Sequence, residues 1–473
     1  MKKLLVVGLF FYLAFLIFTR FYNVEHTAHF TEDESGFLVR THQIYQERKI
    51  TLVGQVNELG TKVFSSLTVY LLLPFAILGK FDPASVFYGA AFWGVLTGLV
   101  MLWLGRLINK KIFWLTAILI LVWFPLLQTG RWAWNPNFIP LWISLGIICY
   151  FQKKSVFHFL AGVFLGLSVH QHYYALFAIA FFALMVTIKA LIKKDFKRAI
   201  FIDLGIILTL LPFIIFDLRH PPGIFILGVS KQIQNAQELN FFNNLINHTF
   251  ETLKYYVQSM ILVFPLILGI IVLLVYDIYK KKKALFFLLP GIFQIIAVST
   301  AAPYGFHYFF PIIPFFFVWL IFHREKFGKI LSLMIISILI IGGSFKLIPF
   351  LKTSPVQPDL TTVKKIDKIL EAQIKERNLK NVNIAVLSSP DPTNYGRKYR
   401  DLLLIPDNVQ ILSREVSDYD ITDNLFVIST SSEEIIRKDV AFEIDNFRYG
   451  LLRGRWPIDN TSWIVYLLTR NEK

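Results

Sequence analysis

The sequence 1-MKKLLVVGLFFYLAFLIFTRFYNVEHTAHFTEDESGFLVRTHQIYQ-46 places an apolar segment between a lysine pair and an acidic pair. The apolar part, near residues 3–20, is long enough to cross about 30 Å of hydrocarbon. Lys2 and Lys3 indicate an inner amino terminus, because cytoplasmic loops carry an excess of basic residues. The segment is therefore expected to run outward, so that Asp33 and Glu34 emerge on the outer face.

The composition of the whole chain is that of a membrane protein. Of its 473 residues, 55% are hydrophobic and 16% are aromatic, which excludes an ordinary soluble domain. The net charge of +16 suggests nucleic-acid binding at first sight, but the basic clusters lie between apolar segments. They are better explained as orientation signals, so no nucleic-acid partner is predicted. The single Cys149 excludes a disulfide framework and a cysteine-based metal site.

The fold class predicted is an α-helical polytopic membrane protein with about eleven transmembrane helices, counted by length. The predicted spans lie near residues 3–20, 84–105, 112–128, 138–152, 156–172, 175–192, 199–216, 257–276, 285–302, 306–322 and 328–346. With the first running outward, nearly every basic cluster falls on the inner side. The segment 66–79 is short for a crossing and is predicted to lie in or dip into the outer interface. An outer loop of about residues 21–83 results.

This orientation gathers reactive side chains on the predicted outer face. Besides Asp33 and Glu34, the candidates are Lys62, Arg131, Trp134, Asn135, His170, His172, Tyr173, Arg219, His220, Tyr304, His307 and Tyr308. Aromatic residues at helix ends also form the ordinary interfacial belt, and each histidine alone is more simply an interfacial residue. The inner loops, however, carry plain lysine and arginine runs. That asymmetry favours an outward-facing site, and the scarcity of charges in mid-span argues against a transport path.

The composition changes near residue 351, and residues 351–473 are charged and soluble-looking. They follow an outward-running span and are predicted to form a small extracytoplasmic α/β domain. A helix is expected at 361–378 and strands at 383–389, 408–413, 425–430 and 463–470. The region shows no Gly-rich phosphate loop, metal-ligand spacing or nucleophile elbow. We expect it to be structural or to contact an acceptor.

The order of these parts resembles the GT-C glycosyltransferases, in particular the branch of the protein O-mannosyltransferases and lipid A aminoarabinose transferases. The resemblance covers roughly residues 1–350 and rests on Asp33-Glu34-Ser35-Gly36-Phe37, on the arginine loop 128-QTGRWA-133 and on 307-HYFFPIIP-314. Two positions depart from the family pattern. The chain has 64-FSSL-67 where many relatives have Pro-Pro-Leu, and 170-HQH-172 where many have a lysine.

The resemblance implies that the domain 1–350, with its outer loop 21–83, is a catalytic membrane module. It would move a sugar from a polyprenyl phosphate to a lipid, glycan or protein acceptor on the outer face of the cell membrane, with inversion. A carboxylate suits the base that the attacking hydroxyl needs, and Asp33 is predicted in that role, with Glu34 positioning the acceptor or the sugar.

The departing phosphate gathers negative charge, and fixed cations and donors are expected to stabilise it. The candidates are Arg131, Arg219, His172 and His307, whereas Trp132, Trp134, Tyr173 and Tyr304 could stack on sugars or line a prenyl groove. No cofactor is certain; His, Glu and Asp on that face could hold a divalent metal, but no ligand spacing is diagnostic. A polysaccharide polymerase or ligase of similar architecture and a lipid-linked sugar transporter are the alternatives, the former supported by an amide-rich loop at about 217–256.

Overall fold

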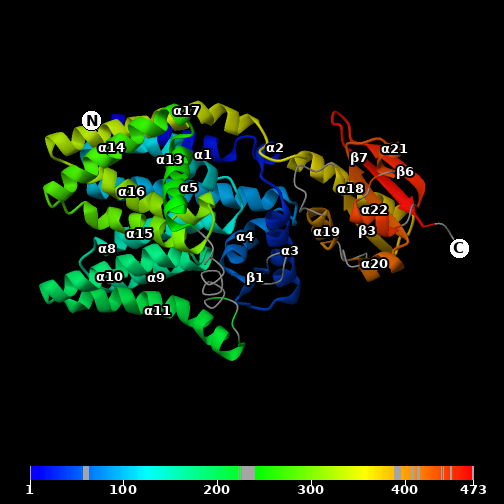
Figure 1. Cartoon of the computed structure of the whole chain (residues 1–473), viewed down its shortest axis with the longest axis horizontal. Coiled ribbons are helices and arrows are strands. Elements are labelled where there is room, and N and C mark those ends of the chain that lie inside the picture. The colour runs from blue at the N-terminus through cyan, green and yellow to red at the C-terminus, as the bar shows by residue number, and fades with distance from the viewer. Residues whose placement is uncertain are drawn as a thin grey trace. The chain divides into compact units, whose positions relative to one another are not determined.

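The computed structural model describes residues 2–56, 63–221, 223, 225, 240–387, 396–405, 410–412, 416–437, 439, 441–447 and 450–470 (Figure 1). The chain divides into two compact units. The first, which we call the helical unit, consists of Met1–Tyr22, Ile50–Leu71 and Tyr88–Leu351. The second, the α/β unit, consists of Asn23–Lys49, Leu72–Phe87 and Lys352–Lys473. Segments near both ends of the chain therefore belong to one unit.

The helical unit is built almost entirely of apolar helices. Its elements are α1 (Lys2–Phe21), β1 (Val53–Val56), β2 (Val63–Ser65), η1 (Lys110–Ile112), α6 (Phe113–Val122), α7 (Phe124–Thr129), η2 (Asn135–Phe138), α8 (Ile139–Tyr150), α9 (Ser155–Gln171), α10 (Ala175–Lys193), α11 (Phe196–Arg219), α13 (Phe241–Val257), α14 (Met260–Tyr279), α15 (Leu285–Ala301), η4 (Phe306–Phe309), α16 (Ile312–Ile321) and α17 (Lys326–Lys352). Two helices, α4 (Leu67–Leu78) and α5 (Ala84–Ile108), have several residues in each unit, and α17 has its last residue in the second unit.

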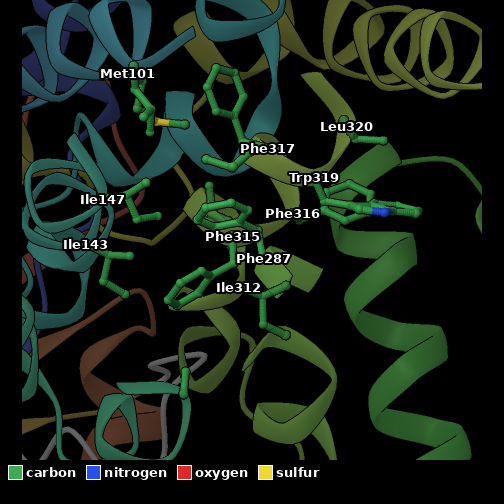
Figure 2. Close-up of a cluster of buried hydrophobic side chains, with 14 of the residues drawn as sticks. Met101, Ile143, Ile147, Phe287, Ile312, Phe315, Phe316, Phe317, Trp319 and Leu320 are labelled. Atoms are coloured by element: carbon green, nitrogen blue, oxygen red, sulfur yellow. The ribbon is translucent and has the colours of Figure 1, made fainter. Parts of the chain in front are cut away.

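Helix α16 forms the centre of the helical unit. Its sequence 312-IIPFFFVWLI-321 is apolar on every side, and all of its residues are buried. A helix that is apolar all round can lie in lipid or in a protein core, and the complete burial of α16 shows that other parts of the protein enclose it. Figure 2 shows this cluster, in which Phe315, Phe317 and Trp319 lie among side chains from other helices such as Met101 and Ile143.

Helices α9 and α11 approach each other closely because glycines face each other at their crossing. A Cβ atom on Gly162 would lie 2.0 Å from the backbone oxygen of Ile202, and one on Gly205 would lie 2.3 Å from the backbone oxygen of Phe159. Small residues allow such backbone contact where lipid supplies no hydrophobic drive for helix association. The two helices run beside α10 in the same part of Figure 1.

The structure confirms helices at most of the predicted spans and corrects two regions. In the described residues, five helices are long and apolar enough to cross a membrane: α5, α10, α11, α14 and α17. The predicted number of about eleven crossings stays a prediction. The segment 112–128 is interrupted at Trp123, where the backbone is extended, and α7 restarts with Pro125 in its first turn. The second half of the predicted loop 217–256 is the helix α13. Its amide residues obscure the helical spacing of the apolar residues in the sequence.

The α/β unit contains a five-stranded sheet with helices beside it. Its elements are α2 (Val24–Thr27), α3 (Glu32–Glu47), α18 (Leu360–Glu376), β3 (Asn381–Val386), α19 (Arg397–Leu403), β4 (Gln410–Ile411), α20 (Val416–Ile421), β5 (Asn424–Ser429), α21 (Glu433–Arg437), α22 (Phe442–Phe447), β6 (Leu451–Pro457) and β7 (Ile464–Thr469). The strand order is β4-β3-β5-β7-β6. Strand β3 is parallel to β4 and β5, whereas β7 is antiparallel to β5 and β6.

The predicted α/β character and four of the five strands are confirmed in this sheet. The strand that the sequence did not reveal is β6, with the sequence 451-LLRGRWP-457. It lies at the edge of the sheet and contains a glycine and a terminal proline, which weaken the strand pattern. Helix α18 matches the helix expected at 361–378, and Asp359 caps it by accepting a hydrogen bond of 2.9 Å from the Thr362 backbone N–H.

We predict that Gly162→Ala destabilises the protein by about 1–3 kcal/mol, since the new methyl group meets a backbone oxygen that cannot rotate away. The measurement is the thermal unfolding midpoint of the full chain in detergent. Gly269→Ala in α14 is the matched control, because its Cβ would lie 3.1 Å from the adaptable Ile335 side chain. Equal midpoints for the two variants would show that α9 and α11 do not pack at Gly162.

Candidate functional site

The two carboxylates of the acidic pair have different environments in the first turn of α3. Glu34 is fully buried, and its Oε2 atom accepts hydrogen bonds from the Thr31 backbone N–H at 2.8 Å and from Thr31 Oγ1 at 2.7 Å. This is a capping box, which satisfies groups that a helix start leaves unpaired. The adjacent Asp33 is only half-buried. Glu34 therefore has a structural task at the start of α3, whereas Asp33 is not fully buried.

The acidic helix α3 is held by a helix of the C-terminal region. Ser35 Oγ donates a hydrogen bond of 2.7 Å to Asp401 Oδ2 on α19, and the Arg397 guanidinium lies 3.9 Å from the same oxygen. Burial raises the pKa of Asp401 to about 6, although the Ser35 hydrogen bond and Arg397 act in the opposite direction. Ser35, two positions after Asp33, is thus bound by Asp401, which lies about 370 residues later in the chain.

A second buried carboxylate lies on α18 in the same unit. Burial raises the pKa of Asp367 to about 8, with the nearby Glu371 and Asp82 carboxylates adding to the effect. Its Oδ1 atom has no hydrogen-bond partner among the described residues. One turn earlier, Lys364 forms ion pairs with Asp82 at 2.7 Å and with Glu25 at 3.4 Å. These contacts hold α18 to the segments before and after α4.

In the helical unit, four of the predicted residues form an aromatic and histidine cluster. The His307 ring lies 4.1 Å from Tyr308, 4.5 Å from Trp134 and 5.1 Å from His172, measured between ring centroids. Trp132 stacks on Trp134 at 4.4 Å. The members of the cluster come from three segments: the residue after α9, the turn before η2, and η4. Indoles can stack on sugar rings, and imidazoles can donate hydrogen bonds to phosphate oxygens.

Three other predicted residues form hydrogen bonds with backbone or side-chain groups of the protein itself. Arg131 donates hydrogen bonds of 2.9 Å to the Thr19 and Tyr22 carbonyl groups at the end of α1, and burial lowers its pKa to about 10. Asn135 donates to the last carbonyl group of α9. His170 lies between Ser65 Oγ at 3.0 Å and a backbone carbonyl of α11 at 2.8 Å. Their predicted contacts with a substrate stay predictions.

The remaining predicted residues do not join the cluster around His307. Arg219 and His220 line a largely apolar cavity of about 410 Å³ at the end of α11. Tyr173 contacts Phe225 at 6.5 Å between ring centroids, and Tyr304 stacks on Phe309 at 5.6 Å. Lys62 lies outside the residues that the structure describes. Among the described residues, no group of three or more His, Cys, Asp or Glu side chains could hold a metal ion.

Sequence reasoning missed the carboxylates of Asp367 and Asp401. Both occur in a region without a recognisable motif, and each acquires its character from burial against segments distant in sequence. The nearest signal is the α18 sequence 360-LTTVKKIDKILEAQIKE-376, in which Asp367 follows the buried Ile366.

Comparisons with known proteins identify the fold. No family model and no curated protein sequence matches this chain. The solved structure of ArnT from Cupriavidus metallidurans bound to undecaprenyl phosphate is 9% identical, with a TM-score of 0.58 over 99% of this chain and 98% of that chain. The apo structure of the same protein is 10% identical, with a TM-score of 0.60 over 98% of each chain. The chain therefore has the same fold as ArnT, and five of its described helices are long and apolar enough to cross a membrane.

We predict that stability decreases as pH rises from 6 to 8, because the folded protein holds a proton on Asp367 that the unfolded chain releases near pH 4. Asp367→Asn should remove most of this decrease and raise the thermal unfolding midpoint at pH 8. The exposed Asp445→Asn is the control and should follow the wild type. An Asp367→Asn protein as sensitive to pH as the wild type would contradict the assignment.

Proposed function

We propose that this protein is an integral membrane glycosyltransferase that moves a sugar from a polyprenyl phosphate to a lipid, glycan or protein acceptor, with inversion. The fold similarity to ArnT supports the class, and one of the ArnT structures contains undecaprenyl phosphate. The observation that carries the proposal is the half-buried Asp33 carboxylate in the first turn of α3. Its neighbour Glu34 is buried and forms the capping box with Thr31.

In the proposed reaction, an acceptor hydroxyl attacks C1 of the sugar. The bond from acceptor oxygen to C1 forms while the bond from C1 to the phosphate oxygen breaks, and the hydroxyl proton passes to the Asp33 carboxylate. A positioned general base of this kind contributes typically 10²–10⁴-fold to the rate. The polyprenyl phosphate leaves with the bonding electrons. Attack from the side opposite the leaving group inverts the anomeric centre.

The cluster around His307 is proposed to contact the donor. Its imidazoles can donate hydrogen bonds to the leaving phosphate, and Trp134 can stack on the sugar. The positions of lysines at the helix ends support an outward orientation of this cluster. Helix α9 begins after Lys154 and ends beside His172, so a helix of 17 residues separates its lysine end from its histidine end. Lysines at the inner end and the cluster at the outer end agree with the positive-inside rule.

We predict that Asp33→Asn reduces transfer by about 10²–10⁴-fold without lowering the thermal unfolding midpoint, because the amide keeps the size of the side chain but cannot accept the proton. The measurement is transfer of radiolabelled sugar from polyprenyl phosphate in membranes that contain equal amounts of each protein.

Glu34→Ala provides the contrast to this variant, since it removes the carboxylate that accepts the Thr31 hydrogen bonds and should lower the unfolding midpoint by the equivalent of about 1 kcal/mol or more. If Asp33→Asn leaves transfer unchanged, the base lies elsewhere. If the wild type transfers sugar from no polyprenyl phosphate to any acceptor tested, the proposed class is wrong.

A further inference from the structure

Two adjoining cavities at one end of the helical unit have strongly basic walls. The larger, of about 700 Å³, we call the basic cavity; its cationic residues are Arg106, Lys110, Lys111 and Lys329. The smaller, of about 400 Å³, shares the three lysines and adds Arg324. None of the residues lining either cavity is acidic. The proposed transfer reaction uses none of these residues.

The charges of the three lysines are not neutralised by any carboxylate in the described parts of the chain. Among the described residues, Lys110, Lys111 and Lys329 have no ion pair with a carboxylate. In a neighbouring cavity of about 570 Å³, by contrast, Lys282 pairs with Glu325. Like charges that converge without a counter-charge repel one another, and a bound anion would offset that repulsion.

The convergence of these lysines is built into the structure. Asn109, which is 4% exposed, donates a hydrogen bond of 3.1 Å to the carbonyl group of Ile321. Arg324 donates in the opposite direction to the carbonyl group of Ile108. These two bonds connect the turn that carries Lys110 and Lys111 to the turn before α17. Lys329 lies in the first turn of α17. The positive-inside rule requires basic residues on one side of the membrane, but it does not require this convergence.

The other wall of the basic cavity is apolar and consists of Leu5, Ile112, Phe113, Trp114, Leu115 and Leu333. Trp114 packs against α1 at Gly8, because only a glycine leaves room for it there. A Cβ atom on Gly8 would be 2.3 Å from Cη2 of the indole. Both Trp114 and Leu5 are more than one-third exposed. A cavity with cations on one side and exposed apolar side chains on the other matches a molecule with an anionic head and a hydrocarbon chain.

We propose that the basic cavity binds an anionic membrane lipid, with the lipid phosphate on Lys110, Lys111 and Lys329 and an acyl chain along Leu5, Trp114 and Leu333. Basic pockets between transmembrane helices on the cytoplasmic side bind such headgroups through the same chemistry. The site is independent of the proposed transferase reaction, and its test needs no sugar donor.

The experiment titrates the full chain, purified in a neutral detergent, with phosphatidylglycerol that carries brominated acyl chains, which quench nearby tryptophans. Lys110→Gln/Lys111→Gln should raise the midpoint of quenching roughly tenfold or more, since each lysine near a lipid surface contributes about 1 kcal/mol. Lys153→Gln/Lys154→Gln, an exposed pair outside the basic cavity, removes the same charge and should shift it less than about twofold. Trp114→Phe should remove a large share of the quenching.

Three results would overturn the proposal. Equal shifts for the two double variants would indicate diffuse surface attraction, and no shift in either would show that the lysines do not bind the lipid. Displacement of the lipid by glycerol phosphate at the same concentrations would indicate a site for soluble phosphate. Thermal unfolding midpoints measured without anionic lipid serve as the folding control, and Lys110→Gln alone replaces the double variant if its midpoint falls.

Discussion

The helical unit depends on satisfying the backbone carbonyl groups at the ends of its apolar helices. The last carbonyl groups of a helix have no partner within the helix, and hydrocarbon supplies no water to replace one. Arg131 donates to the carbonyl groups that end α1, Arg324 to the last carbonyl of α5, Asn109 to that of α16 and Asn135 to that of α9. Polar side chains at helix ends thus bind neighbouring helices together, which explains why several are buried.

Hydrogen bonds within the protein also account for several polar residues at the candidate site. Arg131, Asn135 and His170 have residue types that suit a phosphate or sugar, yet their polar atoms contact the protein. Glu34 likewise serves the start of α3, and Asp33 is left half-buried beside it. A residue type alone therefore identifies candidates, whereas burial and hydrogen-bond partners show which protein groups each candidate contacts.

The C-terminal region has a physical connection to the acidic helix, although its sequence carries no catalytic motif. The carboxylates of Asp401 and Asp367 are buried at a cost in stability, because an ionised carboxylate is poorly solvated there. Asp401 recovers part of that cost through its hydrogen bond from Ser35. Identity of 9–10% to ArnT alongside a shared fold shows that this architecture tolerates nearly complete replacement of its residues. Function must therefore be argued from the site, as the fold alone does not specify it.

The sequence by itself determined the membrane class, the positions of most helices and the α/β character of the C-terminal region. Apolar length and residue periodicity are local properties, so they can be recognised without knowing the contacts. Only the tertiary structure decided that Glu34 is buried while Asp33 is not, that Asp401 holds α3, and that Lys329 converges with Lys110. Each of these outcomes depends on segments far apart in the chain, whose packing sets burial and hydrogen-bond partners that no local pattern encodes.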